Sequence, residues 1–205
     1  MDIVARAKGM LMAPAPEWSA VAAESTDVAT LFRSYVIPMV GVSVIGGLLK
    51  VLLIGGGIVA AILSIIVGFI LACVGVFVIG KIAEFLAPQF GGPQDGIAGM
   101  KLASYAPTPS WIGQALSFIP VIGGILALIG GLYSLYLYYL GGPIVMRVPQ
   151  DRALGFTVAV IVAAIIAVSL VVTSWIGQSR DRILAERAEA KAQAEAGAVA
   201  EQTGD

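Results

Sequence analysis

The sequence predicts an all-α fold: a polytopic transmembrane helix bundle of five spans, with short amphipathic N-terminal helices and a charged C-terminal helix or tail. Hydrophobic residues make up 59% of its 205 residues and charged residues only 12%, whereas soluble domains are about half apolar and about a quarter charged. Its mean hydropathy is +0.95. Several uncharged runs reach the length of about 20 residues that a helix needs to cross the hydrocarbon layer. We therefore expect an integral membrane protein.

Residues 1–34 are expected to form an amphipathic or interfacial N-terminal segment. Hydrophobic residues at helical spacing predict a short helix in the headgroup plane, from which Arg6 and Lys8 reach lipid phosphates. A disordered tail is the alternative. Pro14 must interrupt the helix because proline lacks an amide hydrogen. A second short amphipathic turn then begins near Trp18, whose indole suits the membrane interface.

The five spans together make a membrane domain at residues 35–176. Glycines 55–57 permit a tight reversal between the first two spans. The connection after the fourth span holds glycine, proline and charged residues, which end a span and begin a loop. The expected spans cover about residues 36–54, 58–79, 96–119, 121–140 and 154–175.

The third expected span contains prolines that a membrane helix must accommodate. Lys101 lies near its start, where the long stem can carry the ammonium group to the interface. Pro107 and Pro109 free backbone carbonyls, which is tolerated only where neighbouring helices, hydroxyl groups or water satisfy them. The hydroxyl groups placed to do so are those of Ser104, Thr108 and Ser110. We expect a kinked span packed against protein, with a re-entrant or surface segment as the alternative.

Basic residues set the expected orientation. With the N-terminus in the cytoplasm, the basic residues of the N-terminal segment and of the inner connections all lie inside, and the short outer turns carry none. An odd number of spans then places the tail, residues 177–205, outside. That placement conflicts with the tail's arginines and lysine, which favour the cytoplasm. The Ala- and Glu-rich composition of the tail favours a solvated helix.

The composition argues against enzymatic chemistry. The chain has no histidine and a single cysteine, Cys73, so the common pairs of nucleophile and base cannot form. No spacing of carboxylates would hold a metal, and no glycine pattern indicates a nucleotide cofactor. The net charge of -1 gives no basic field for nucleic acid. We expect no catalytic residues, no cofactor, no metal and no nucleic-acid partner.

Glycines, lysines and tyrosines have structural interpretations. Small residues four apart, such as Gly99 and Ala103, allow close packing within the chain or across a dimer face. Lys50, like Lys101, lies at the end of a span and is expected to anchor it at the interface. The tyrosines at the end of the fourth span are typical of an interfacial belt, with a polar contact to the kinked third span as the alternative: Tyr133, Tyr136, Tyr138 and Tyr139.

Four segments together resemble a known family. They are "APEW" near the N-terminus, "YVIP" at the first span, "GIAGMKLASYAPTPSWIGQALSFIPVIGG", and "GLYSLYLYYLGGPIVMRVP". Their order and spacing are similar to those of the bacterial branch of the Yip-one (Ypt-interacting protein) domain family, over residues 14–175. The resemblance implies five spans and a cytoplasmic N-terminus. It implies that six residues belong to the membrane module: Tyr105, Pro107, Pro109, Trp111, Gly142 and Pro143. With Tyr133 and Tyr136 of the tyrosine cluster, these are the candidate structural or interaction residues.

Eukaryotic members of that family are implied to act in vesicle traffic and to contact prenylated GTPases through a long cytosolic N-terminal region. Only about 35 residues precede the first span here, so GTPase binding is not supported by this chain. We expect a non-enzymatic scaffold or adaptor of a bacterial inner membrane. Its expected partners are membrane lipids, other membrane proteins or a second copy of itself. The alternative is a small transporter or channel subunit whose path is lined by the kinked third span.

Overall fold

The structure is a computed structural model that describes residues 2–53, 55, 57–170 and 173, and these residues contain helices and no strands. The chain divides into two units, residues 1–164 and 165–205, and the packing below is that of the first. The C-terminal tail lies outside the described residues. The α-helices are α1 (Ile3–Met12), α2 (Pro14–Ala23), α3 (Val28–Leu31), α4 (Ile37–Leu53), α5 (Ile58–Leu86), α6 (Gly96–Tyr105), α7 (Thr108–Ala115), α8 (Ile122–Val145) and a last helix at 153–170.

Four helical segments among the described residues are long and apolar enough to cross a membrane: Val28–Leu53, Ala61–Phe90, Ile122–Val145 and Gln150–Leu170. The all-α membrane bundle is thus confirmed, but the count of five continuous spans is wrong. The first of these segments joins α3 to α4 through a π-helical turn at Phe32–Val36. Asp27 begins it, because its carboxylate accepts the Thr30 amide at 3.0 Å.

The segment expected as the third span is broken into α6 and α7. The break falls at residues 106–107, because Pro107 and Pro109 cannot donate the backbone hydrogen bonds that a continuous helix requires. The Thr108 hydroxyl donates to the Tyr105 carbonyl at 2.6 Å, so one predicted repair of a carbonyl is present. The prediction for Ser104 is wrong, since its hydroxyl is buried without a hydrogen-bond partner among the described residues.

Close backbone approaches show how the broken segment runs. A side chain on Gly141, late in α8, would meet Leu102 of α6, and one on Gly130 would meet the Pro109 carbonyl. A side chain on Gly123, at the start of α8, would meet the carbonyl of Leu116, just after α7. Together α6 and α7 therefore return antiparallel along the length of α8, in two short pieces rather than one helix.

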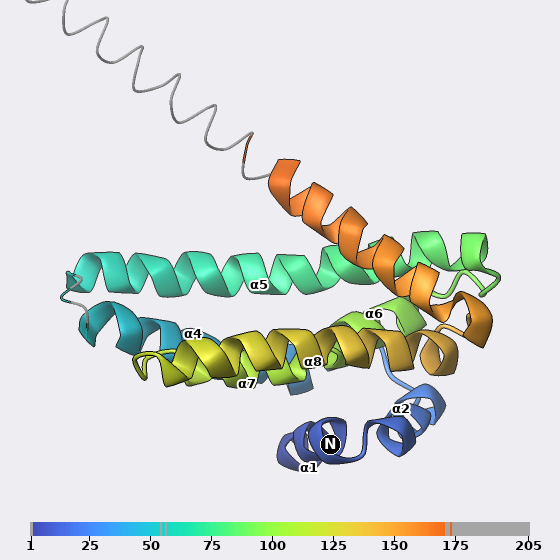
Figure 1. Cartoon of the computed structure of the whole chain (residues 1–205), viewed down its shortest axis with the longest axis horizontal. Helices are drawn as coiled ribbons and strands as arrows, with labels where there is room; N and C mark the ends of the chain where they lie inside the picture. Colours follow the sequence, from blue (N-terminus) through green and yellow to red (C-terminus); the bar gives the residue numbers. More distant parts are fainter. Residues whose placement is uncertain (1, 54, 56, 171–172, 174–205) are drawn as a thin grey trace, which may run out of the picture. The chain divides into compact units, whose positions relative to one another are not determined.

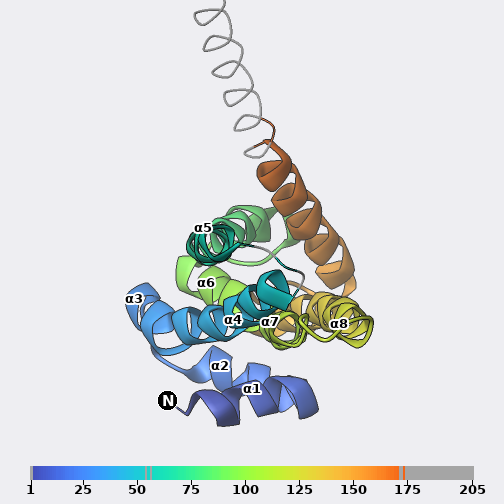
Figure 2. The same cartoon turned by 90° about the vertical axis from the view of Figure 1, so that its left-hand side faces the viewer.

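The helices of the first unit surround α6. Helix α6 packs against α5 on one side and α8 on another, and α7 lies between α4 and α8. Figure 2 shows α1 and α2 on the side of the α4, α7 and α8 layer that is opposite to α5. Figure 1 shows α1 and α2 beside the bundle, near the end of α8 that α6 contacts. Residues 98–106 are all buried, so this polar-containing segment lies at the centre of the packing.

Glycine doublets explain how closely α7 packs. In each of three pairs, the first glycine faces a backbone carbonyl of the α7 region so closely that no side chain fits, while the second has nothing within 4 Å of an added Cβ. Close packing of this kind brings membrane helices together without polar contacts. The three pairs are Gly46 with Gly47, Gly123 with Gly124, and Gly130 with Gly131.

Candidate functional site

Arg6 connects both N-terminal helices through two ion pairs. Its guanidinium nitrogens lie 2.7 Å from a carboxylate oxygen of Glu17, in α2, and 2.7 Å from one of Glu24, just after α2. The Arg6 side chain is only 11% exposed. Charge-assisted hydrogen bonds of this length are about twice as strong as neutral ones. The expectation that Arg6 reaches lipid phosphates is therefore wrong, whereas Lys8 is exposed as expected.

Lys101 extends the cluster from α6. It is 6% exposed and donates to the carbonyl oxygen of Glu24 at 2.5 Å and to that of Ala22 at 3.4 Å. The last carbonyls of a helix lack partners within the helix, so a cation at the end of α2 satisfies them. The prediction that Lys101 anchors a span at the interface is wrong. We call Arg6, Glu17, Glu24 and Lys101 the N-terminal clasp.

Aromatic rings form the floor of the clasp. The Arg6 guanidinium lies 5.4 Å from the centroid of the Tyr105 ring, within cation–π range. The ring of Tyr35 lies 4.6 Å from Tyr105, and that of Trp18 meets it edge-on at 6.5 Å. The Tyr35 hydroxyl forms a buried hydrogen bond of 2.7 Å with the Thr108 hydroxyl. The clasp is thus joined to the break between α6 and α7.

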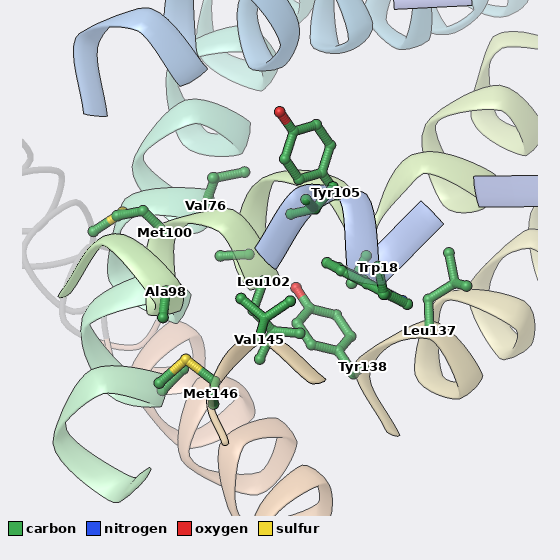
Figure 3. Close-up of a cluster of buried hydrophobic side chains, with 14 of the residues drawn as sticks. Trp18, Val76, Ala98, Met100, Leu102, Tyr105, Leu137, Tyr138, Val145 and Met146 are labelled. Carbon is green, nitrogen blue, oxygen red and sulfur yellow. The ribbon is translucent and has the colours of Figure 1, made fainter. Parts of the chain in front are cut away.

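Trp18 lies inside the protein rather than at the membrane interface. It is fully buried, and Figure 3 shows it with Tyr105, Leu102 and Tyr138 in the hydrophobic cluster. The predicted interfacial position is wrong, because α2 packs its indole against Gly141 of α8, where an added Cβ would lie 3.0 Å from the ring. The Trp18 indole nitrogen and the Tyr138 hydroxyl have no hydrogen-bond partner among the described residues.

Of the residues singled out in the sequence, Tyr105 alone belongs to the floor of the clasp. Pro107 precedes α7, and Pro109 lies in its first turn. Tyr133 donates to the Leu11 carbonyl at 2.9 Å. Its ring is tilted against that of Tyr136, with 5.6 Å between the ring centroids, and Tyr136 is 45% exposed. The tyrosine cluster therefore makes a polar contact with α1, and no hydrogen bond in the described chain joins it to α6 or α7.

The last three singled-out residues lie apart from the clasp. Trp111, 5% exposed, lines a cleft beside α7. Gly142 faces Phe156, with an added Cβ 3.2 Å from the ring, and Pro143 lies within the last turn of α8. The contact at Gly142 brings the end of α8 against the last helix.

The cleft beside α7 has a volume of about 670 Å³ and lies among α4, α5, α7 and the start of α8. Its polar lining is Ser43, Lys50, Ser64, Gln114 and Ser117. The apolar lining includes Val44, Val51, Gly68 and Ala72. Among the described residues, Lys50 is the only charged one in this lining.

Sequence reasoning missed the carboxylates of the clasp. Glu17 and Glu24 lie 11 and 18 residues from Arg6, beyond the spacing of three or four residues that pairs side chains on one helix. A usable signal was charge balance. Two basic residues, Arg6 and Lys8, are followed by Glu17 and Glu24 within one short segment, so the segment can balance its charges internally. Within the described residues, no group of three His, Cys, Asp or Glu side chains could hold a metal ion.

The comparisons with known proteins agree with the fold. No curated protein and no solved structure matches the chain. The family model of the Yip1 domain matches residues 8–172, which include the clasp residues Glu17, Glu24 and Lys101, the cleft beside α7 and most of the helices described above. Together with the four long apolar helices, this match indicates a multi-pass membrane protein. The chain therefore belongs to the Yip1 domain family.

Proposed function

We propose that this protein is a non-enzymatic membrane scaffold or adaptor. It acts through contacts with lipids and with other membrane proteins, or with a second copy of itself. The observation that carries the proposal is the clasp: Arg6 ties two carboxylates of the N-terminal segment together, and Lys101 ties the end of α2 to the centre of the bundle. The four charges are used to hold helices together, which is what a rigid platform requires.

The platform is the outward surface of α1 and α2. Ser19 is exposed on α2, and Lys8, Val4 and Met12 are exposed on α1, with Val4 at 72% and Met12 at 73%. A surface that mixes apolar and basic groups suits a protein partner at the membrane boundary. Because α1 and α2 are held in place before binding, a partner does not have to order them.

Site-specific crosslinking tests the scaffold role. A photoreactive amino acid at Ser19 should give a discrete protein adduct in intact membranes, and Arg6→Met should abolish it by releasing α1 and α2. The same group at Val158, which is exposed on the last helix, should give mainly lipid adducts in both backgrounds. If Ser19 also gives only lipid adducts, the scaffold role is wrong.

We propose that the protein lies in a bacterial inner membrane with its N-terminus in the cytoplasm, as its basic residues suggest. Single cysteines at Gly92 or Gln150, in a chain with Cys73→Ala, should be protected from an impermeant thiol reagent in intact cells. A cysteine at Gly57 should react. Residues 92 and 150 are expected to behave alike because a Cβ on Gly92 would lie 2.8 Å from the Met146 carbonyl, at the end of α8. Labelling at residue 92 would reverse the proposed orientation.

The cleft favours one other function, that of a small transporter or channel subunit. Its hydroxyl and amide groups lie beside the broken α6 and α7 segment, as expected for a path lined by a discontinuous helix. Solute flux through the purified protein in liposomes would support this function. Blocking of that flux by Gly47→Leu, which places a side chain in the cleft, would assign the path to it.

A further inference from the structure

Lys50 is a cation without a carboxylate in its part of the chain. No aspartate or glutamate occurs between Asp27 and Glu84, or between Asp95 and Asp151. These two intervals include all of α4, α7 and α8 and most of α5, which are the helices that line the cleft. Among the described residues, Lys50 forms no salt bridge. Its counter-ion must therefore come from outside these helices.

The position of Lys50 matches the headgroup level of a membrane. It lies three residues before the end of α4 at Leu53, in a segment long and apolar enough to span the hydrocarbon layer. A lysine there extends its ammonium group to the interface, where lipid phosphates are found. Lys50 is exposed and lines one end of the cleft, so its ammonium group can reach an external anion.

The cleft walls suit a hydrocarbon chain. The Ser43 and Ser64 hydroxyls donate within their own helices, to the Val40 carbonyl at 2.8 Å and to the Ala61 carbonyl at 2.7 Å. These hydroxyls therefore need no partner in the cleft. The apolar residues of the remaining wall lie on α4, α5, α7 and α8, and its other uncharged polar residues are Gln114 and Ser117. The outer surface of α5 beside it is apolar and exposed, as lipid-facing helices are.

We propose that this cleft binds one anionic glycerophospholipid. The phosphate lies at the Lys50 ammonium group, and one acyl chain lies between α4, α5 and α7. A nonspecific annular lipid would satisfy the charge but would not need the cleft, so the two parts of the proposal can be tested separately. None of the residues that line the cleft belongs to α1 or α2. The proposal therefore stands even if the crosslink at Ser19 is not found.

The role of the Lys50 charge is tested in nanodiscs that contain equal amounts of phosphatidylglycerol and phosphatidylcholine. The full chain is released into mild detergent, and native mass spectrometry counts the lipids that remain bound. One lysine near a membrane surface corresponds to a preference of about fivefold for the anionic lipid. Lys50→Gln should remove that preference and Lys50→Arg should keep it. Arg152→Gln, a change at an exposed cation outside both the cleft and the platform, should also keep it, and equal retention in all four proteins would overturn the proposal.

The cleft is tested by filling it. Gly47 lines the cleft and has nothing within 4 Å of an added Cβ, so Gly47→Leu should fold normally while occupying the acyl-chain position. Gly41 is equally open but does not line the cleft, so Gly41→Leu is the matched control. Gly47→Leu should lose the retained lipid and Gly41→Leu should keep it, at equal thermal stability. Retention of the lipid by Gly47→Leu would place it elsewhere and overturn the proposal.

Discussion

Where α6 meets α1 and α2, the bundle is held by charges and hydrogen bonds, whereas around α7 it is held by backbones that touch at glycines. The clasp region joins α1, α2 and α6 through ion pairs, carbonyl contacts and an aromatic floor. The α7 region joins α4 and α8 at Gly46, Gly123 and Gly130, with few polar contacts. A cation near α6 is satisfied by the chain itself, but Lys50, beside α7, is not.

The difference between the two regions shows where a chain with few charged residues uses them to fix the packing of its helices. Where the N-terminal helices meet the bundle, polar groups fix one geometry because an unpaired buried charge is costly. Where apolar helices meet in lipid, the hydrophobic effect does not favour one neighbour over another, so close packing must provide the specificity. Thr108 lies between the two regions and bonds to residues of both α6 and the first apolar segment.

Arg6→Met should have the largest effect on stability, because it leaves Glu17 and Glu24 without their cation. Breaking a fully buried ion pair costs about 3–5 kcal/mol. The carboxylates keep 23% and 32% exposure, so we expect a loss of about 2–3 kcal/mol in the free energy of unfolding. Lys50→Met is the matched change beside α7 and should leave the free energy of unfolding almost unchanged. Thermal unfolding in mild detergent measures both, and similar losses would remove the distinction between the regions.

A glycine doublet tests the packing around α7. Gly130→Ala forces a Cβ against the Pro109 carbonyl and should cost about 2 kcal/mol through overpacking. Gly131→Ala meets open space and should leave stability unchanged or raise it by up to about 1 kcal/mol, because alanine favours helix. The unfolding temperatures of the two variants should therefore move in opposite directions. A loss of stability from Gly131→Ala as large as that from Gly130→Ala would show that the close contact at Gly130 is not the cause of the loss.

The sequence predicted what depends on periodicity and composition. Long apolar runs identified the four long helices. Pro107 and Pro109 predicted a kink within one span at 96–119, where the structure instead has a break between two helices. Length and apolarity do not show whether a helix with two prolines continues. The burial of Lys101 and Trp18 could not be predicted, because each depends on residues brought from a distant segment. A lysine near a span end has the same sequence signal whether it meets water, phosphate or a carbonyl.

The junction between the two regions is tested at Thr108. Thr108→Val keeps the side-chain shape but leaves the buried Tyr35 hydroxyl without its partner, and should cost about 1 kcal/mol. Ser104→Ala removes a hydroxyl that has no partner in the described chain and should change stability by less than about 0.5 kcal/mol. Adding Tyr35→Phe to Thr108→Val should recover part of the loss, because no hydroxyl is then unsatisfied. No recovery in the double variant would show that packing, not the hydrogen bond, matters at this junction.

The smallest effect is expected at Asp27, at the rim of the clasp region. Hydrogen bonds from the Thr30 hydroxyl and amide hold the pKa of the Asp27 carboxyl below its ordinary value of 3.8. Because the folded pKa is the lower one, the carboxylate stabilises the helix start above the unfolded pKa, and this contribution is lost as the pH falls through the folded pKa. The difference in unfolding temperature between the parent and Asp27→Ala should therefore shrink on acidification from neutral pH. A difference that stays constant would assign the effect to helix geometry instead of charge.

The clasp itself is tested most directly by hydrogen–deuterium exchange of the full chain in lipid nanodiscs. The backbone amides of α1 and α2 should be protected for as long as those of α6, because the clasp makes the three helices one unit. In Arg6→Met, protection should fall in α1 and α2 and stay unchanged in α5. Rapid exchange of α1 and α2 in the parent protein, or protection that Arg6→Met does not alter, would contradict the clasp.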